Sequence, residues 1–272
     1  MAEDSPLVRE LVRDVLEKAG FTVTAVGDGV EALDQLARQS FAVVVSDVHM
    51  PRLDGLELLA RLRSLPRSPP VVLLTADDAP ETVLRAVRAQ ALFYLPKPMA
   101  RETLVQVVCA AMSAAPPQPI EVLSAEPHWV ELLVPCERAA AERIGGFLMQ
   151  LKADLAPDVR ESVGRVFREL LLNAIEWGGQ LDPSRRVRIA FLRGKGLLLY
   201  RIADPGSGFR FREIPHAAIS NPPGDPLAHA EVRQTKGLRA GGLGLMIASA
   251  EADELLYNEA QNEVVFVRYL RG

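Results

Sequence analysis

Three polar side chains follow apolar runs in the first half of the chain, each at the point where a buried strand would end. Asp47 closes "FAVVVSD", Thr75 lies in "PVVLLTA" and Lys97 in "LFYLPKP". A carboxylate at such a position can accept a phosphoryl group, a lysine can neutralise phosphate charge, and a hydroxyl can bond a phosphoryl oxygen. Any one of these residues alone could simply end a strand, but the three together favour phosphoryl chemistry.

Two adjacent carboxylates near the N-terminus, Glu3 and Asp4, could complete a metal site with Asp47. Mg²⁺ prefers oxygen ligands, and it bridges carboxylate and phosphoryl oxygens in phosphoryl transfer. We therefore expect Glu3, Asp4 and Asp47 to converge on one Mg²⁺ ion.

The elements that must position these residues alternate between helix and strand over residues 6–113. Helical apolar spacing and caps mark helices at 6–20, 28–39, 55–65, 80–90 and 101–112, and β-branched or apolar runs mark strands at 21–26, 41–47, 70–76 and 92–98. Continuous apolar strands suit a parallel sheet covered on both faces. In such α/β folds ligands bind at the carboxyl ends of the strands, which is where the polar residues fall.

The segments "SDVHMPRLDG", "LLTA" and "YLPKP" resemble the receiver domain of two-component response regulators, over residues 1–113. The resemblance implies a flavodoxin-like, doubly wound α/β fold. It makes Asp47 the phospho-acceptor and Glu3 and Asp4 the acidic pair, and it adds the backbone carbonyl of His49 as a Mg²⁺ ligand.

The same resemblance assigns roles on the other strands. Thr75 and Lys97 would sense the phosphoryl group, and Tyr94 would report their state to an output surface. Gln90 stands where the family often has glycine. An upstream histidine kinase is the implied phosphodonor.

Receivers of this family place a short apolar strand before the acidic pair, and no residues for that first strand precede Glu3 here. Burying about five apolar residues is worth on the order of 10 kcal/mol, while whole domains are stable by about 5–15 kcal/mol. We therefore expect the natural chain to start upstream of Met1. The alternative is that the phosphorelay role has been lost.

A proline-rich stretch, "SAAPPQPIEVLSAEP", divides the chain at residues 113–127. Its closely spaced prolines exclude helix and suit a semi-rigid extended linker. The predicted organisation is a receiver domain at 1–114, a linker at 115–124 and a second domain at 125–272.

The second half contains a long helical pattern, "APDVRESVGRVFRELLLNAIEWGG", in which Glu169, Asn173 and Glu176 fall at i, i+4 and i+7 on one face. A strand and a helix are expected before it, at 128–136 and 137–151. Two hairpins are expected after it, at 185–204 and 253–270. Alone, the polar stripe would be read as a solvated helix face.

Two glycine-rich segments change that interpretation. The strand "LLLYRIAD" leads directly into "DPGSGF", which places Asp204 at a strand end followed by Gly206 and Gly208. A carboxylate there can accept a hydrogen bond from a ring amine, and the glycines allow a flat base to approach. Further along, "GLRAGGLGLMIASA" supplies glycines before a helix, whose exposed amides can bind an anion; these are Gly241, Gly242 and Gly244.

The three motifs together resemble the ATP-binding fold shared by gyrase, heat-shock chaperone, histidine-kinase and mismatch-repair ATPases, and most closely the anti-sigma-factor serine kinases. The resemblance covers residues 125–272 and implies an α+β two-layer sandwich. It makes Asn173 a Mg²⁺ ligand, Glu169 the general base and Asp204 the reader of the adenine amine, with the five glycines lining bound ATP.

Residues 209–240 would form a lid from which Arg233, Lys236 or Arg239 could reach the phosphates, although each is more often a solvated charge. Trp177 stands where the family often has histidine.

The resemblance and the composition together lead to a functional hypothesis. None of the four histidines, at positions 49, 128, 216 and 229, is placed as the acceptor of a sensor kinase. We expect a response regulator whose receiver controls an ATP-dependent serine/threonine kinase or an anti-sigma-like partner switch acting on an anti-anti-sigma-like or sigma-factor-like protein. The alternative is a non-catalytic ATP-binding interaction module with a degenerate receiver.

Composition limits the other classes of partner. The net charge of −4 argues against direct nucleic-acid binding and against a membrane surface. The two cysteines, Cys109 and Cys136, are widely separated and favour a reducing, cytoplasmic compartment. The sequence does not decide between a monomer and a homodimer.

Overall fold

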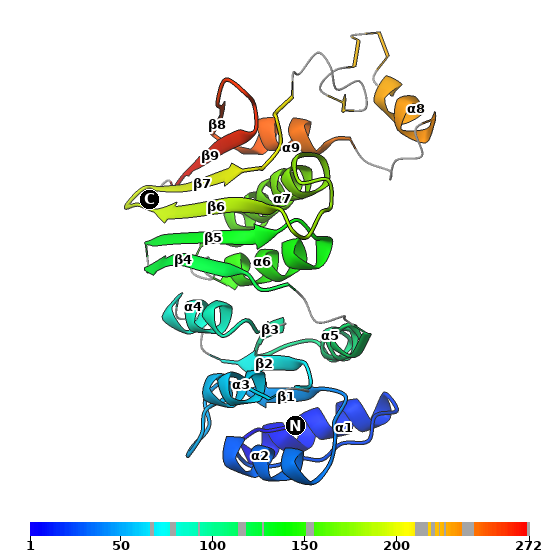
Figure 1. The fold of residues 1–272 in the computed structure, drawn as a ribbon, viewed down its shortest axis with the longest axis vertical. Coiled ribbons are helices and arrows are strands. Elements are labelled where there is room, and N and C mark those ends of the chain that lie inside the picture. Colours follow the sequence, from blue (N-terminus) through cyan, green and yellow to red (C-terminus); the bar gives the residue numbers. More distant parts are fainter. Residues whose placement is uncertain are drawn as a thin grey trace. The chain divides into compact units, whose positions relative to one another are not determined.

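A computed structural model describes residues 1–65, 68–76, 80–91, 93–113, 118–126, 128–150, 155–209, 217–218, 221–222, 224–225, 227–235 and 242–270. The chain divides into two compact units, Met1–Pro117 and Gln118–Gly272 (Figure 1). Among the described helices, none combines the length and apolar character needed to span a bilayer.

The first unit is organised around a parallel sheet of order β1-β2-β3, formed by Val44–Asp47, Val71–Thr75 and Phe93–Pro96. Every residue of β1 and β2 is buried, which is the pattern of strands covered on both faces. The helices are α1 (Pro6–Lys18), α2 (Gly29–Arg38), α3 (Gly55–Arg63), α4 (Pro80–Arg88) and α5 (Arg101–Ser113).

The predicted strand at 21–26 is wrong, because only Val26 forms a β-bridge in that segment. Ala2 bridges Val26 on one side and Ser46 on the other, both in parallel. The Ala2 amide donates to the Val45 carbonyl at 2.9 Å, and the Asp47 amide donates to the Ala2 carbonyl at 2.9 Å. Each of the two bridges joins Ala2 to a single residue, so neither extends into a strand pairing.

The second unit contains a six-stranded antiparallel sheet of order β4-β5-β6-β7-β9-β8. Its strands are β4 (Glu121–Glu126), β5 (Trp129–Pro135), β6 (Arg186–Arg193), β7 (Leu197–Ala203), β8 (Glu254–Tyr257) and β9 (Glu263–Tyr269). The expected hairpins are β6-β7 and β8-β9. Strand β4, however, begins inside the stretch that the sequence assigns to the linker, because its alternating residues pair with β5.

Helices cover one face of this sheet (Figure 1). They are α6 (Arg138–Gln150), α7 (Pro157–Asn173) and α9 (Gly244–Glu251), and a short helix, α8 (Ala228–Thr235), lies between α7 and α9 in the chain. Helix α7 continues into a π-helix, η1 (Ala174–Gly178). Two layers, one of helices and one of antiparallel strands, form the α+β sandwich expected from the sequence.

An aromatic cluster fills the space between the two layers. Tyr200 of β7 stacks on Phe266 of β9 at a ring-centroid distance of 4.7 Å, and it contacts Phe191 of β6 at 4.8 Å. Phe167 of α7 contacts Tyr200 from the helix layer at 5.4 Å. All four rings are at most 2% exposed, so they tie α7 to the strands that carry Asp204.

Replacing Tyr200 with alanine is expected to lower the free energy of unfolding of the second unit by about 3–5 kcal/mol, because it leaves a cavity among three rings. Denaturant titration followed by tryptophan fluorescence reports on this unit, since both tryptophans, Trp129 and Trp177, belong to it. The half-buried neighbour Leu199 is the matched control, and Leu199→Ala should cost about 1 kcal/mol. Equal costs for the two variants would contradict the assignment of Tyr200 to the centre of the core.

Candidate functional site

Three carboxylates gather at the carboxyl end of β1 in the first unit. Ligand oxygens of Glu3, Asp4 and Asp47 lie within 4.8 Å of one another. Glu3 directly follows the Ala2 bridge and Asp47 ends β1, so the sheet pairing itself brings them together. Glu3 and Asp47 are buried, and Asp4 is exposed. Oxygen donors at this spacing fit Mg²⁺, and these three residues would hold it.

Lys97 offsets part of the negative charge of the carboxylates. Its Nζ donates to Glu3 Oε2 at 2.6 Å and lies 3.1 Å from Asp47 Oδ1. The Lys97 amide also donates to the Thr75 carbonyl at 2.6 Å, which fixes the start of the lysine side chain beside β2. Burial raises the pKa of the Glu3 carboxyl, and the hydrogen bond from Lys97 acts in the opposite direction.

The other predicted residues of this site come from the neighbouring strands. Asp47 pairs with Leu74 of β2, so Thr75 lies one residue further along the adjacent strand, where it is 1% exposed. Tyr94 of β3 is also buried. The side chain of His49 is exposed, and the role of its carbonyl stays a prediction.

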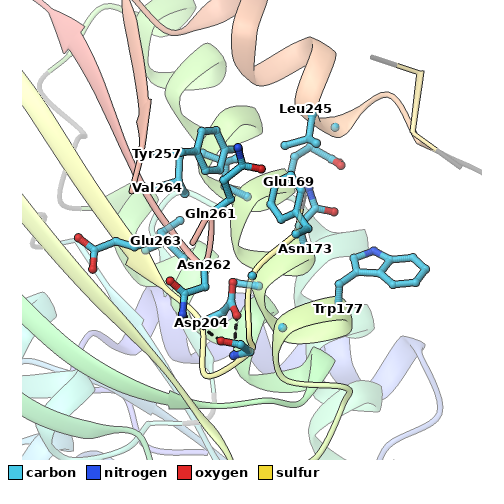
Figure 2. Close-up of a pocket in the computed structure, with 18 of the residues that line it drawn as sticks. Glu169, Asn173, Trp177, Asp204, Leu245, Tyr257, Gln261, Asn262, Glu263 and Val264 are labelled. Atoms are coloured by element: carbon cyan, nitrogen blue, oxygen red, sulfur yellow. Dashed lines mark hydrogen bonds between the residues drawn. The ribbon is translucent and has the colours of Figure 1, made fainter. Parts of the chain in front are cut away.

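The second unit has a cavity of about 690 Å³, a size typical of small-molecule sites. Helices α7 and α9 supply one wall, and the ends of β7, β8 and β9 with their connections supply the other (Figure 2). The polar residues that line it include Glu169, Asn173, Arg185, Asp204, Gln261 and Asn262.

Glu169 and Asn173 meet the start of α9 on one side of this cavity. A Cβ added to Gly244 would lie 2.6 Å from Glu169 Oε2 and 3.5 Å from Asn173 Nδ2. A side chain at position 244 would therefore require the Glu169 carboxylate to move away from the first turn of α9. The first turn of a helix presents free amides to anions, so a carboxylate, a carboxamide and an anion-binding backbone share one region.

Asp204 lies below Glu169 and Asn173 in Figure 2. The Gly206 amide donates to Asp204 Oδ1 at 2.7 Å, and the Asp204 amide donates to the Asn262 carbonyl at 2.8 Å. Gly208 has a φ of +84°, and a Cβ there would lie 1.6 Å from the Ala260 carbonyl oxygen, so this position requires glycine. Burial raises the pKa of the Asp204 carboxyl, while the Gly206 bond opposes the shift.

Two family models match separate parts of the chain. Residues 1–109 match the response regulator receiver domain, and residues 135–268 match the histidine kinase-like ATPase domain. The chain carries a receiver domain followed by a histidine kinase-like ATPase domain.

Individual relatives resemble the receiver domain. The response regulator MprA of Mycobacterium leprae (strain TN) is 41% identical over 115 residues, which cover 42% of this chain and 50% of that protein. The chain thus spans about half the length of the curated relatives it matches.

Two solved structures match the chain at a lower sequence identity than that relative. The receiver domain of the Francisella response regulator 1452 is 31% identical with a TM-score of 0.39, and the match covers 41% of this chain and 92% of that one. The chemotaxis response regulator CheY4 of Vibrio cholerae is 32% identical with a TM-score of 0.38, and the match covers 40% and 93%.

In the ATPase domain, the π-helix η1 corrects one expectation from helical spacing. Beyond Asn173 the wider helix breaks the i, i+4, i+7 stripe, so Glu176 leaves the cavity and pairs with Arg138 at 3.0 Å. Trp177 and Gly178 line the cavity instead. Trp177 is 43% exposed and lies at the rim in Figure 2.

Sequence reasoning missed Gly178 as a site residue. A Cβ at Gly178 would lie 2.1 Å from Asp204 Oδ1, so this glycine is needed for Asp204 to sit against η1. The pair "GG" at 178–179 was the available signal, but it also fits an ordinary helix end. Arg185, which donates to the Pro205 carbonyl at 2.5 Å, is a second lining residue that carried no signal.

The remaining predicted residues of the ATPase domain have mixed outcomes. Gly206, Gly208, Gly242 and Gly244 line the cavity. Gly241, Lys236, Arg239 and the Arg233 side chain lie outside the described residues. Within the lid region, His229 is 5% exposed, and its amide donates to Asn221 Oδ1 at 2.9 Å.

Replacing Asp204 with asparagine is expected to raise the free energy of unfolding at neutral pH while it weakens nucleotide binding at least about tenfold. The raised pKa means that the folded state binds a proton more readily than the unfolded state, so ionised Asp204 destabilises the fold above its raised pKa. The stability advantage of the variant should therefore shrink as the pH falls through the raised pKa toward the ordinary value.

Denaturant unfolding across pH, together with ADP titration, checks both effects. The control is Asp182→Asn, because this exposed carboxyl has its pKa lowered by Ser184 and should show the opposite sign. An Asp204→Asn variant less stable than the wild type at neutral pH would contradict the burial argument.

Proposed function

We propose that this chain is a two-component response regulator whose receiver domain controls an ATP-binding output domain, and that the output domain is a protein serine/threonine kinase of the anti-sigma-factor type. The observation that carries the proposal is the meeting of Glu169, Asn173 and the Gly244 backbone on one side of the cavity. A carboxylate that can act as a base, a carboxamide that can bind a metal and a helix start that can bind an anion therefore lie together, and this combination supports phosphoryl transfer from ATP.

The two ends of the cavity divide the recognition of ATP between them. Asp204, steadied by the Gly206 amide, accepts a hydrogen bond from the exocyclic amine of adenine. The amides of the first turn of α9 face the phosphates, and the Asn173 carboxamide would hold Mg²⁺ beside them. When bound, that ion would screen the charge of the phosphates.

The proposed reaction transfers the γ-phosphoryl group to a serine or threonine of a protein partner. Glu169 takes the hydroxyl proton as the hydroxyl oxygen forms a bond to the γ-phosphorus, and the bond from this phosphorus to the β,γ-bridging oxygen breaks to release ADP. The partner is of the anti-anti-sigma type, in line with the resemblance of the "NAIEWG" segment to that kinase family.

Receiver control follows from the charge arrangement around Asp47. An upstream histidine kinase would supply the phosphoryl group, which adds negative charge beside Lys97 and Thr75. Lys97 then has a third anionic partner in addition to Glu3 and Asp47. A redistribution of its contacts biases a two-state surface and thereby the output domain.

Acetyl phosphate is expected to label the wild-type chain at Asp47 in the presence of Mg²⁺, and Asp47→Asn should abolish labelling. In this step a carboxylate oxygen of Asp47 forms a bond to phosphorus while acetate leaves. Intact-mass measurement with site mapping follows the modification. Asp14→Asn, which removes an exposed carboxylate of α1 paired with Lys18, should label normally. An unlabelled wild type would support a degenerate receiver.

Glu169→Ala is expected to reduce phosphotransfer by about 100-fold or more and to leave ATP binding within a few-fold of the wild type, because a general base acts on the transferred proton rather than on ATP. Radiolabelled ATP and purified anti-anti-sigma-like proteins provide the assay.

Glu161→Ala is the matched control for this substitution. Glu161 lies on the same helix α7 and pairs with Arg165 at the surface, so its loss should leave transfer unchanged. Retained ATP binding with no transfer by the wild type to any candidate partner would instead favour a non-catalytic ATP-binding interaction module.

A further inference from the structure

The π-helix η1 interrupts the regular α-helical geometry beside the ATPase-domain cavity. The Gly179 amide donates to the Ala174 carbonyl at 2.8 Å, and the Leu181 amide donates to the Ile175 carbonyl at 3.0 Å. Gln180 and Leu181 then adopt φ values of 58° and 55°, which side chains rarely take. A π-helix is a poor conformation on its own, so the surrounding structure must hold this segment in place.

The segment leading into α6 supplies that support from behind η1. Cys136 packs directly beneath Gly179, where an added Cβ would lie 2.2 Å from Cys136 Sγ. Arg138, the first residue of α6, donates from its Nε to Glu176 Oε1 at 3.0 Å. The Glu176 side chain is only 9% exposed, whereas the Arg138 side chain is 58% exposed.

The opposite side of η1 forms part of the cavity. Gly178 packs against the Asp204 carboxylate, and Trp177 lines the rim. A shift of η1 from π to α hydrogen bonding would rotate these two residues relative to Asn173, which precedes them. The position of η1 therefore determines how much space is left beside Asp204, at the end of the cavity assigned to adenine.

We propose that the Arg138–Glu176 ion pair is a positioning element that holds η1 in its π-helical register. It thereby shapes the end of the nucleotide cavity that receives adenine, beside Asp204. The inference rests on the proposed function, in that the ligand is an adenine nucleotide. Arg138 acts through η1 and does not line the cavity, so its contribution is to position Gly178 and Trp177.

The test uses the full chain with Trp129→Phe, which leaves Trp177 as its single indole. In this background Arg138→Met is expected to weaken ADP binding about tenfold and to raise the quenching of Trp177 by acrylamide about twofold, because η1 loses its tether. Arg138→Lys should restore part of both, since it keeps the charge. Glu176→Gln combined with Arg138→Met should be no worse than Arg138→Met alone, because both changes break the same contact.

Arg188→Met is the matched control for this set. Arg188 forms a comparable ion pair with Glu131 at 2.6 Å on the strands β6 and β5, and it does not line the cavity. Its loss should leave both ADP affinity and Trp177 quenching unchanged, which separates positioning from a general loss of stability.

The possible outcomes separate the two proposals. ADP affinity within twofold of the wild type, with unchanged Trp177 quenching, would overturn the role of Arg138 and leave the proposed function intact. If the parent chain binds no ADP, the proposed function fails. The quenching comparison between Arg138→Met and Arg188→Met then still decides whether the ion pair holds η1.

Discussion

The shape of the ATPase-domain cavity depends on the close approach of the half-buried Asp204 carboxylate to the backbone of two glycines, Gly178 and Gly206. Asp204 sits against Gly178 and accepts a hydrogen bond from Gly206, and no side chain larger than hydrogen fits at Gly178 without displacing it. Burial makes the charged form of Asp204 costly, as its raised pKa indicates. A ligand that donates a hydrogen bond to Asp204 would offset this cost.

In the receiver domain, the main electrostatic feature is a cluster of carboxylates with one lysine. Three carboxylates converge where a single Lys97 supplies the compensating charge among the described contacts of the cluster. One lysine cannot neutralise three carboxylates, so the cluster retains a net negative charge that suits a divalent cation. The backbone bond from Lys97 to Thr75 of β2 keeps the lysine within reach of both Glu3 and Asp47.

The sequence predicted the residues at strand ends well, because burial and strand position are linked by local patterns. Asp47 and Thr75 each end a run of buried residues, and Asp204 follows a strand of alternating burial, as the local patterns indicated. Features set by tertiary contacts were not predictable. The π-helix contacts Cys136 and Arg138, which are distant in sequence, and the 21–26 segment reads as a strand but forms a single β-bridge, between Val26 and Ala2. The start of strand β4 was assigned to the linker, because closely spaced prolines precede it in the sequence.

The short connection between the domains has a thermodynamic consequence. Helix α5 ends at Ser113 and strand β4 begins at Glu121, so seven residues, 114–120, join the last helix of the receiver domain to the edge strand of the ATPase-domain sheet. A fully extended chain spans at most about 3.3–3.6 Å per residue, so this connection limits how far apart its two ends can lie. Because the two domains share one chain, any influence of the receiver domain on the ATPase domain would be independent of the protein concentration. A coupling free energy of about 1–3 kcal/mol between the domains would be enough to change the output several-fold or more.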